Sequence, residues 1–162
     1  LTSNGRKTDP KTIERYISAL MESFLIYRAG RYDVKGKQLL KTLEKYYVVD
    51  LGLRRHLLSG RSQDTGHILE NIIYFELLRR SYDVAIGKLD NKQVDFIATK
   101  TDEKKYIQVT EAMTSSETRE RELAPLQKIS DNYEKLVIAM DPGLTQNQDG
   151  IKIVSAIDFL LG

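Results

Sequence analysis

The sequence predicts a mixed α/β protein, with a small amino-terminal unit and a larger carboxy-terminal unit built on a mixed sheet. Apolar residues recur at helical spacing between residues 13 and 24. After residue 66, runs rich in β-branched and aromatic residues alternate with helical patterns. A polar, glycine-bearing stretch over residues 59–66 separates the two regions. We therefore expect one domain over residues 1–61 and a second over residues 62–162.

The first unit should begin with a helix that starts at Asp9 and Pro10. Aspartate can accept hydrogen bonds from the free amides of the first turn, and proline at the first helical position loses no hydrogen bond. An apolar stripe follows, made of Ile13, Tyr16, Ile17, Leu20, Met21 and Phe24. Strands are expected over residues 24–31 and 45–50, with a basic turn over residues 35–41 between them. Helix, strand, basic turn and strand is the order found at the end of a winged helix.

The second unit should follow the order helix, three strands, helix and strand, with an addition at its end. The pattern predicts helices over about residues 66–81, 116–130 and 155–161, and strands over residues 83–88, 92–100, 104–112, 134–140 and 151–154. Pro125 lies inside the second of these helices and should kink or restart it.

The composition is that of an ordinary globular protein. With 162 residues, 41% of them hydrophobic, the chain can bury one sizeable core or two small ones. The absence of cysteine excludes disulfides and thiolate zinc sites, and a cytoplasmic location fits this best. The apolar runs are too short and too often interrupted by charge for a membrane span or a signal peptide. A first residue other than methionine suggests a piece of a longer protein.

Charge is divided unevenly along the chain. Residues 1–61 hold 13 Lys and Arg against 6 Asp and Glu, a balance of +7, whereas residues 62–162 hold 12 against 17, a balance of −5. Cations of the first unit could contact nucleic-acid phosphates, which gives salt-sensitive binding with little dependence on base sequence. The alternative is a protein contact, in which they face the acidic half or another domain. The candidate cations are Arg6, Lys7, Lys11, Arg15, Lys35, Lys37 and Lys41.

Polar residues follow one another in an order typical of metal-dependent nucleases. Glu70 lies on an apolar helix, Asp95 on the strand that follows, and Gln108 on the next strand. Strands take up aspartate unwillingly, so a metal or a charged partner would explain Asp95. Magnesium prefers oxygen ligands, and the carboxylate of Asp95, the side-chain carbonyl of Gln108 and the backbone carbonyl of Val109 could supply them, with Glu70 acting directly or through water. The alternative is that Glu70 and Asn71 bind the neighbouring loop and only fix the geometry of the domain.

The set departs from the nuclease pattern at one position. That pattern has an acid, any residue and then a lysine, where this chain has Gln108, Val109 and Thr110. A lysine would offset the negative charge that develops on the phosphate during hydrolysis, and threonine cannot. The sequence offers substitutes for this cation, each of which is more commonly a solvated or ion-paired side chain. They are Lys92, Arg119, Arg121 and Lys128.

Several stretches together resemble the carboxy-terminal region of a family of bacterial and archaeal P-loop ATPases. In that family an AAA+-type ATPase module is followed by a winged helix and then by a domain of unknown function resembling the PD-(D/E)xK restriction-endonuclease-like fold. The resemblance implies that Glu70, Asp95 and Gln108 occupy the positions of the site acids, and that Thr110 stands at the lysine position. It places ATP binding in a preceding module outside this chain. The stretches are residues 31–54, 66–89, 93–100, 106–113 and 118–141.

Three functions are compatible with this sequence. The first is a non-catalytic or weakly catalytic module of the ATPase that binds nucleic acid, with DNA as the expected partner, and regulates the ATPase. The second is a magnesium-dependent nuclease in which Asp95, Glu70 and Gln108 surround the metal and a cation from elsewhere completes the site. The third is a protein-interaction domain that docks the ATPase onto a partner or onto a second copy of itself, as a homo-oligomer.

Overall fold

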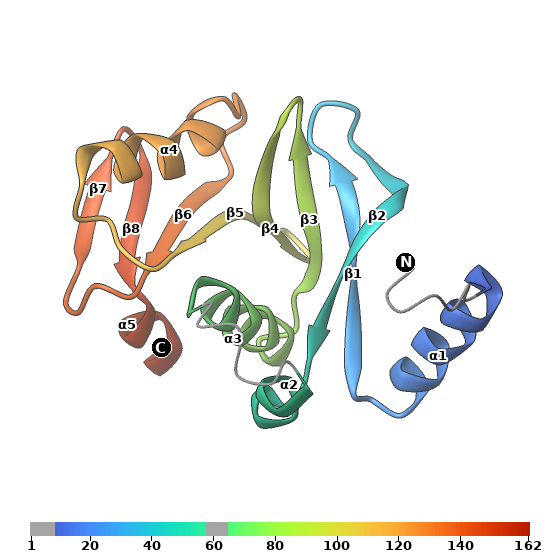
Figure 1. The fold of residues 1–162 in the computed structure, drawn as a ribbon. Coiled ribbons are helices and arrows are strands. Elements are labelled where there is room, and N and C mark those ends of the chain that lie inside the picture. The colour runs from blue at the N-terminus through green and yellow to red at the C-terminus, as the bar shows by residue number, and fades with distance from the viewer. Residues whose placement is uncertain (1–8, 58–64) are drawn as a thin grey trace.

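The computed structural model describes residues 9–57 and 65–162, and all statements on the fold refer to these residues (Figure 1). The chain alternates helices with strands from end to end. The helices are α1 (Pro10–Glu22), α2 (Leu51–Leu57), α3 (Thr65–Arg79), α4 (Ser116–Gln127) and α5 (Ala156–Leu161). The strands are β1 (Ile26–Asp33), β2 (Gln38–Val48), β3 (Asp83–Leu89), β4 (Lys92–Lys100), β5 (Glu103–Thr110), β6 (Glu134–Ala139), β7 (Thr145–Gln148) and β8 (Ile151–Ser155).

The described strands form one eight-stranded mixed sheet in the order β2-β1-β3-β4-β5-β6-β8-β7. Neighbours that are joined by a hairpin turn pair antiparallel, whereas β1 with β3, β5 with β6 and β6 with β8 pair parallel. The mixed α/β fold class predicted from the sequence is therefore confirmed. The hairpin of β1 and β2 belongs to the same sheet as the strands of the second half.

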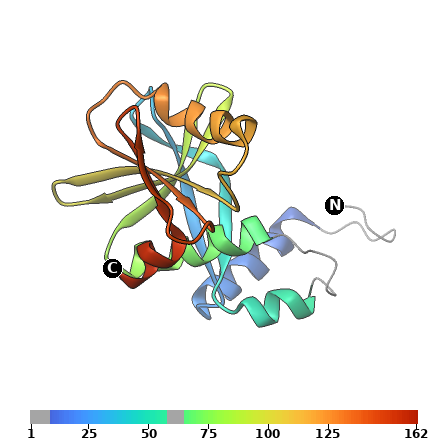
Figure 2. The ribbon, with the colours of Figure 1, turned by 90° about the vertical axis from the view of Figure 1, so that its left-hand side faces the viewer.

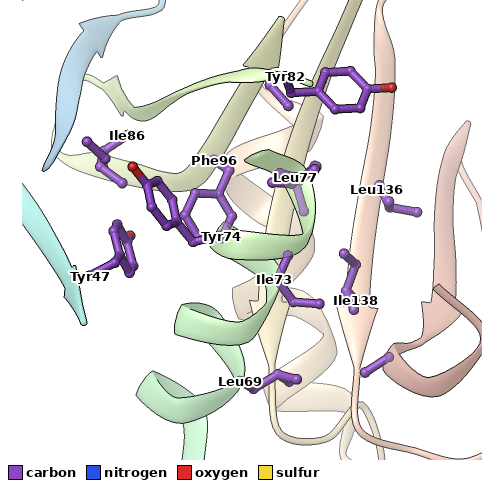
Figure 3. Close-up of a cluster of buried hydrophobic side chains, with 14 residues drawn as sticks. Tyr47, Leu69, Ile73, Tyr74, Leu77, Tyr82, Ile86, Phe96, Leu136 and Ile138 are labelled. Carbon is purple, nitrogen blue, oxygen red and sulfur yellow. The ribbon is translucent and has the colours of Figure 1, made fainter. Parts of the chain in front are cut away.

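Helices cover both faces of this sheet (Figure 2). On the face covered by α3 and α5, Ile73 and Leu77 pack against alternate strand residues such as Phe96 and Ile138 (Figure 3). On the opposite face, Leu126 of α4 packs with strand residues whose side chains point away from α3. Successive residues of a strand point to opposite faces, so one continuous apolar run supplies both layers of the core. The buried strand residues of the core layer on the α4 side include Val94, Ile97, Tyr106, Val137, Ile151 and Ile153.

The first helix begins where the sequence predicts. The carboxylate of Asp9 accepts a hydrogen bond from the backbone N–H of Lys11, and Pro10 occupies the first helical position. None of the residues of α1 is buried; its Tyr16 is 65% exposed, and Phe24, just after the helix, is 69% exposed. The apolar stripe of this helix therefore adds little to the core.

The order α3, β3, β4, β5, α4, β6 is the helix, three strands, helix and strand that the sequence predicts. Two elements were not expected, the short helix α2 and the polar strand β7. Strand β2 begins at Gln38, inside the segment expected to be a basic turn, because an edge strand can hold its charged side chains in solvent. Pro125 lies in the last turn of α4, which ends two residues later.

The winged-helix description and the boundary between residues 61 and 62 stay predictions. The described part of the first unit is a helix and a hairpin that continues the large sheet. The boundary itself falls outside the described residues. Across residues 9–57 and 65–162, no helix has the length and apolar character needed to cross a membrane.

Candidate functional site

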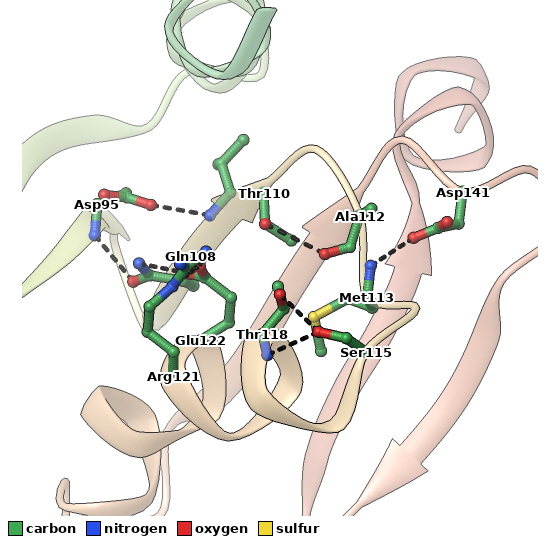
Figure 4. Close-up of polar contacts among 11 residues, drawn as sticks. Asp95, Gln108, Thr110, Ala112, Met113, Ser115, Thr118, Arg121, Glu122 and Asp141 are labelled. Atoms are coloured by element: carbon green, nitrogen blue, oxygen red, sulfur yellow. Dashed lines mark hydrogen bonds and ion pairs between the residues drawn. The ribbon is translucent and has the colours of Figure 1, made fainter.

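The candidate site lies where β4 and β5 separate. The two strands pair from Phe96 opposite Ile107 to the turn, and Asp95 and Gln108 are the first residues beyond the paired part. Beyond that point, side chains accept the hydrogen bonds that backbone carbonyls of the neighbouring strand would otherwise accept. The N–H of Val109 donates to Asp95 Oδ2 at 2.9 Å, and the N–H of Asp95 donates to Gln108 Oε1 at 3.4 Å (Figure 4). The strands thus diverge without leaving these backbone amides unpaired.

A cavity of about 550 Å³ opens beside this fork, and it contains the three residues that the sequence singled out. Glu70 reaches it from α3, Asp95 from β4 and Gln108 from β5. Residues 38 positions apart therefore meet in one place. The lining is completed mainly by polar side chains, among them Lys45, His67, Gln93, Thr110, Glu111, Thr118, Arg121 and Glu122.

Lys45 of β2 brings a positive charge into the cavity. Its Nζ donates to Glu70 Oε1 at 2.9 Å. Sequence reasoning missed this residue, because it lies 25 positions before Glu70 on a strand of the first unit. Of the substitutes expected from the sequence, Arg121 reaches the cavity, where it pairs with Glu122 at 2.9 Å. The other three, Lys92, Arg119 and Lys128, are not among the residues that line it.

Tyr47 holds the same oxygen of Glu70 as Lys45 does. Its hydroxyl donates to Glu70 Oε1 at 2.6 Å, and its ring stacks on Tyr74 with 4.0 Å between the ring centroids. Burial raises the pKa of Tyr47 far above its ordinary value, and the nearby charge of Glu70 raises it further. The hydroxyl therefore stays protonated and remains a donor. Lys45 and Tyr47 share a face of β2 because they are two residues apart.

Asn71 fastens the end of β2 to α3. Its Nδ2 donates to the carbonyl of Val48 at 2.9 Å, and its Oδ1 accepts from the N–H of Val48 at 3.0 Å. The amide acts here as a backbone unit would, which completes the pairing of an edge residue. For Asn71, the structure shows the geometry-fixing role that was one of two alternatives.

The carboxyl group of Asp95 has a raised pKa of about 6. Burial is the main cause, and the charges of Glu70 and Glu122 act in the same direction. The hydrogen bond from Val109 and the charge of Lys45 oppose the rise. Asp95 therefore changes its protonation state near pH 6.

Glu122 is the acid that sequence reasoning did not find. It is buried on α4, where Oε1 accepts from Arg121 and Oε2 accepts from Gln108 Nε2 at 3.2 Å. The alternating charges of residues 119–122 are typical of a solvated helix face, which hid it. The one signal in the sequence is that Leu126 follows four residues later, on the same side of the helix.

The arrangement fits a magnesium ion only in combination with a phosphate. In residues 9–57 and 65–162, no three His, Cys, Asp or Glu side chains are placed to hold a metal ion. Glu70 and Glu122 are held by cations, and the carbonyl of Gln108 faces the amide of Asp95. Asp95 Oδ1 accepts no hydrogen bond from this part of the chain. Magnesium commonly binds one or two carboxylates together with substrate phosphates and water, so Asp95 can serve as such a ligand.

Of the cations predicted to bind nucleic acid, those within the described residues do not line the cavity. Lys11 and Arg15 are exposed on α1. Lys35, Lys37 and Lys41 are exposed at the hairpin of β1 and β2, where Lys35 pairs with Asp90 at 2.7 Å. Arg6 and Lys7 lie outside the described residues.

Comparison with known proteins gives three matches. Residues 3–64 match a domain of unknown function (DUF8612). An uncharacterised protein of Haemophilus influenzae is 42% identical over 161 residues, which is 99% of this chain and 40% of that protein. An uncharacterised protein of Methanocaldococcus jannaschii is 28% identical over 156 residues, 94% of this chain and 34% of that protein. No solved structure matches the chain significantly.

These matches show how much of each relative the chain spans and which part of the cavity lies in the matched segment. The chain spans about two fifths of the first relative and a third of the second. The segment similar to DUF8612 contains Lys45 and Tyr47, whereas Glu70, Asp95 and Gln108 follow it. The cavity is therefore built jointly by the matched segment and by the rest of the chain.

Proposed function

We propose that this chain is a nucleic-acid-binding module whose cavity takes up a divalent cation together with a phosphodiester, and hydrolyses that phosphodiester weakly. The observation that carries this proposal is the position of Lys45. It lies in the cavity that contains Glu70, Asp95 and Gln108, and supplies the positive charge that Thr110 cannot. A cation beside the phosphate stabilises the negative charge that develops as the phosphodiester is attacked.

Each polar side chain has a separate task in this proposal. Asp95 would hold the divalent cation, while the N–H of Val109 fixes its Oδ2 oxygen. When bound, such a cation polarises the phosphate and lowers the pKa of a coordinated water. Glu70 Oε2, which lies 3.5 Å from His67 Nδ1, would accept the proton of the attacking water. As the water oxygen bonds to phosphorus, the P–O bond to one sugar oxygen breaks, and that oxygen leaves and takes up a proton from solvent. Tyr47 keeps the Glu70 carboxylate oriented through Oε1.

Two features make the hydrolysis slow. Gln108 stands where the nuclease pattern has an acid, so the cavity offers one negative charge fewer to a divalent cation. Lys45 is neutralised by Glu70 at 2.9 Å, and its charge must be shared between Glu70 and the phosphate. Binding is therefore the main activity of the module, and cleavage is secondary.

We further propose that the module belongs to a longer P-loop ATPase and reports nucleic-acid binding to it. The resemblance of residues 31–141 to the carboxy-terminal region of such ATPases supports this. The relative from Haemophilus influenzae, of which the chain spans 40%, is long enough for a second module. DNA is the expected partner, and the exposed cations of the hairpin add contacts to phosphates outside the cavity.

Cation-dependent DNA binding tests this proposal. We expect a fluorescein-labelled DNA duplex to bind the chain more tightly with Ca²⁺ than with EDTA, because the cation joins Asp95 to a phosphate. Asp95→Ala should remove the difference between the two conditions, whereas Asp83→Ala, an exposed aspartate of β3, should preserve it. Equal binding with Ca²⁺ and EDTA in the unaltered chain, or a cation effect that survives Asp95→Ala, would contradict the proposal.

A further inference from the structure

Arg31 is a half-buried arginine that lacks an anionic partner in the described part of the chain. Its Nε is shielded from solvent and makes no hydrogen bond there. The guanidinium has one long contact, from Nη2 to Gln93 Oε1 at 3.5 Å. By contrast, Arg28 on the same strand pairs with Glu44 at 3.3 Å, and Arg80 pairs with Glu76 at 2.6 Å.

Such a group is costly in a folded protein. A buried donor without an acceptor loses its hydration and gains nothing in exchange, and the cost is larger when the group is charged. A buried polar group that remains unpaired in a native protein calls for an explanation, and a bound ion or a functional role is among them. Arginine presents a planar fork of donors that matches the oxygens of a phosphate.

The position of Arg31 connects it with the cavity. Its contact residue, Gln93, lines the cavity and precedes Asp95 by two residues on β4. The pairing of β3 with β4 shifts register between Val94 and Ile97, and both Gln93 and Asp95 line the cavity at this irregularity. Arg31 therefore stands next to the cavity without taking part in the cluster around Asp95.

We infer that Arg31 binds a second phosphate of the nucleic-acid backbone, next to the phosphate held at Asp95. This inference rests on the proposed function and adds the class of ligand to it. The ligand is a strand with at least two consecutive phosphates, and the guanidinium donates hydrogen bonds to the second one. Inorganic phosphate has only one phosphate group. When that group is bound at Asp95, the ligand has no second phosphate to contact Arg31, so Arg31 does not increase its affinity.

The test compares Arg31→Met with a matched control, Arg28→Met, on the same strand. The probe is fluorescein-labelled oligothymidylate, titrated by fluorescence anisotropy in Ca²⁺ at several salt concentrations. We expect Arg31→Met to weaken binding about tenfold, because the variant loses one charged hydrogen-bonded contact with the DNA backbone. The dependence of log Kd on log salt should become shallower by about 0.7, the value for one contact with a single strand. Arg28→Met should leave both quantities unchanged, because Glu44 already neutralises Arg28.

The outcomes separate this inference from the proposed function. If the unaltered chain binds the oligonucleotide with a cation effect that depends on Asp95, and Arg31→Met binds equally well, the inference is wrong and the proposed function stands. If the unaltered chain binds no oligonucleotide, both are wrong. Asp95→Ala should lose the cation effect but keep the contribution of Arg31 to the salt slope.

A second variant guards against a failure to fold. Arg31→Met should fold, because it removes an unpaired buried charge, and circular dichroism during heating checks this. Arg31→Lys keeps the charge but loses the fork of donors, so we expect affinity between those of the unaltered chain and Arg31→Met. An affinity of Arg31→Lys equal to that of the unaltered chain would overturn the inference where Arg31→Met cannot be measured.

Discussion

Lys45 Nζ lies 2.9 Å from Glu70 Oε1, so a residue of the amino-terminal hairpin neutralises the helix carboxylate of the cavity. The same oxygen accepts a hydrogen bond from the hydroxyl of Tyr47 at 2.6 Å. Asn71, the next residue of the helix, binds both backbone groups of Val48 on the hairpin. Three contacts therefore tie β2 to α3 at the place where the cavity opens, and the site requires this strand to be in position.

Removing the lysine should destabilise the fold. Lys45→Met leaves the largely buried carboxylate of Glu70 without its cation, and we expect the free energy of unfolding to fall by about 2 kcal/mol. Urea denaturation of Lys45→Met, Glu70→Gln and the double variant measures the coupling between the two residues. We expect a coupling of about 1 kcal/mol or more. A coupling near zero would show that the pair adds nothing to stability.

The hydroxyl of Tyr47 should contribute to stability separately from its ring. Tyr47→Phe keeps the stacking on Tyr74 and removes only the donor to Glu70, at an expected cost of about 1.5 kcal/mol. Tyr46→Phe is the matched control, because the hydroxyl of Tyr46 donates to Glu44 in an exposed position, and its loss should cost less than about 0.5 kcal/mol. Equal midpoints in urea for the two variants would contradict this assignment.

The raised pKa of Asp95 predicts how stability depends on pH. The group titrates near pH 6 in the folded protein, against about 3.9 in an unfolded chain. The folded state therefore binds the extra proton between these values, and the stability that the neutral carboxyl provides is lost as the pH rises through 6. Asp95→Asn should match the original at pH 4 and be more stable at pH 8 by on the order of 2 kcal/mol.

Urea denaturation of both proteins between pH 4 and pH 8 checks this prediction. Asp83→Asn, a change in an exposed aspartate, serves as the control and should follow the pH profile of the original. Parallel profiles for Asp95→Asn and the original would mean that Asp95 has an ordinary pKa in the folded chain.

Much of the fold follows from local patterns in the sequence. Asp9 and Pro10 mark a helix start by themselves, and the apolar runs of β4 to β6 need no distant information. Strand β7 could not be predicted, because Thr145–Gln148 contains no apolar residue and is held by backbone pairing with β8. Helix α2 is only seven residues long, and its apolar pattern is too short to distinguish a helix from other structure.

The site was predictable only in part, for a related reason. The order of Glu70, Asp95 and Gln108 is visible in the sequence, because each stands out against apolar neighbours. Lys45 and Glu122 do not stand out, since both lie in segments rich in charge. Their arrival at the cavity depends on how β2 and α4 pack against the sheet, which is a tertiary relation that spacing along the chain does not contain.

The most direct test of the central claim is metal-dependent cleavage of DNA by variants at two lysines. With Mg²⁺ or Mn²⁺ and a labelled DNA, the original chain should cleave slowly, Lys45→Met should lose cleavage, and Lys92→Met should keep it, because Lys92 is not among the residues that line the cavity. Circular dichroism first confirms that both variants are folded. Cleavage by folded Lys45→Met at the original rate, or no metal-dependent cleavage by the original chain, would contradict the claim that Lys45 supplies the missing charge of this site.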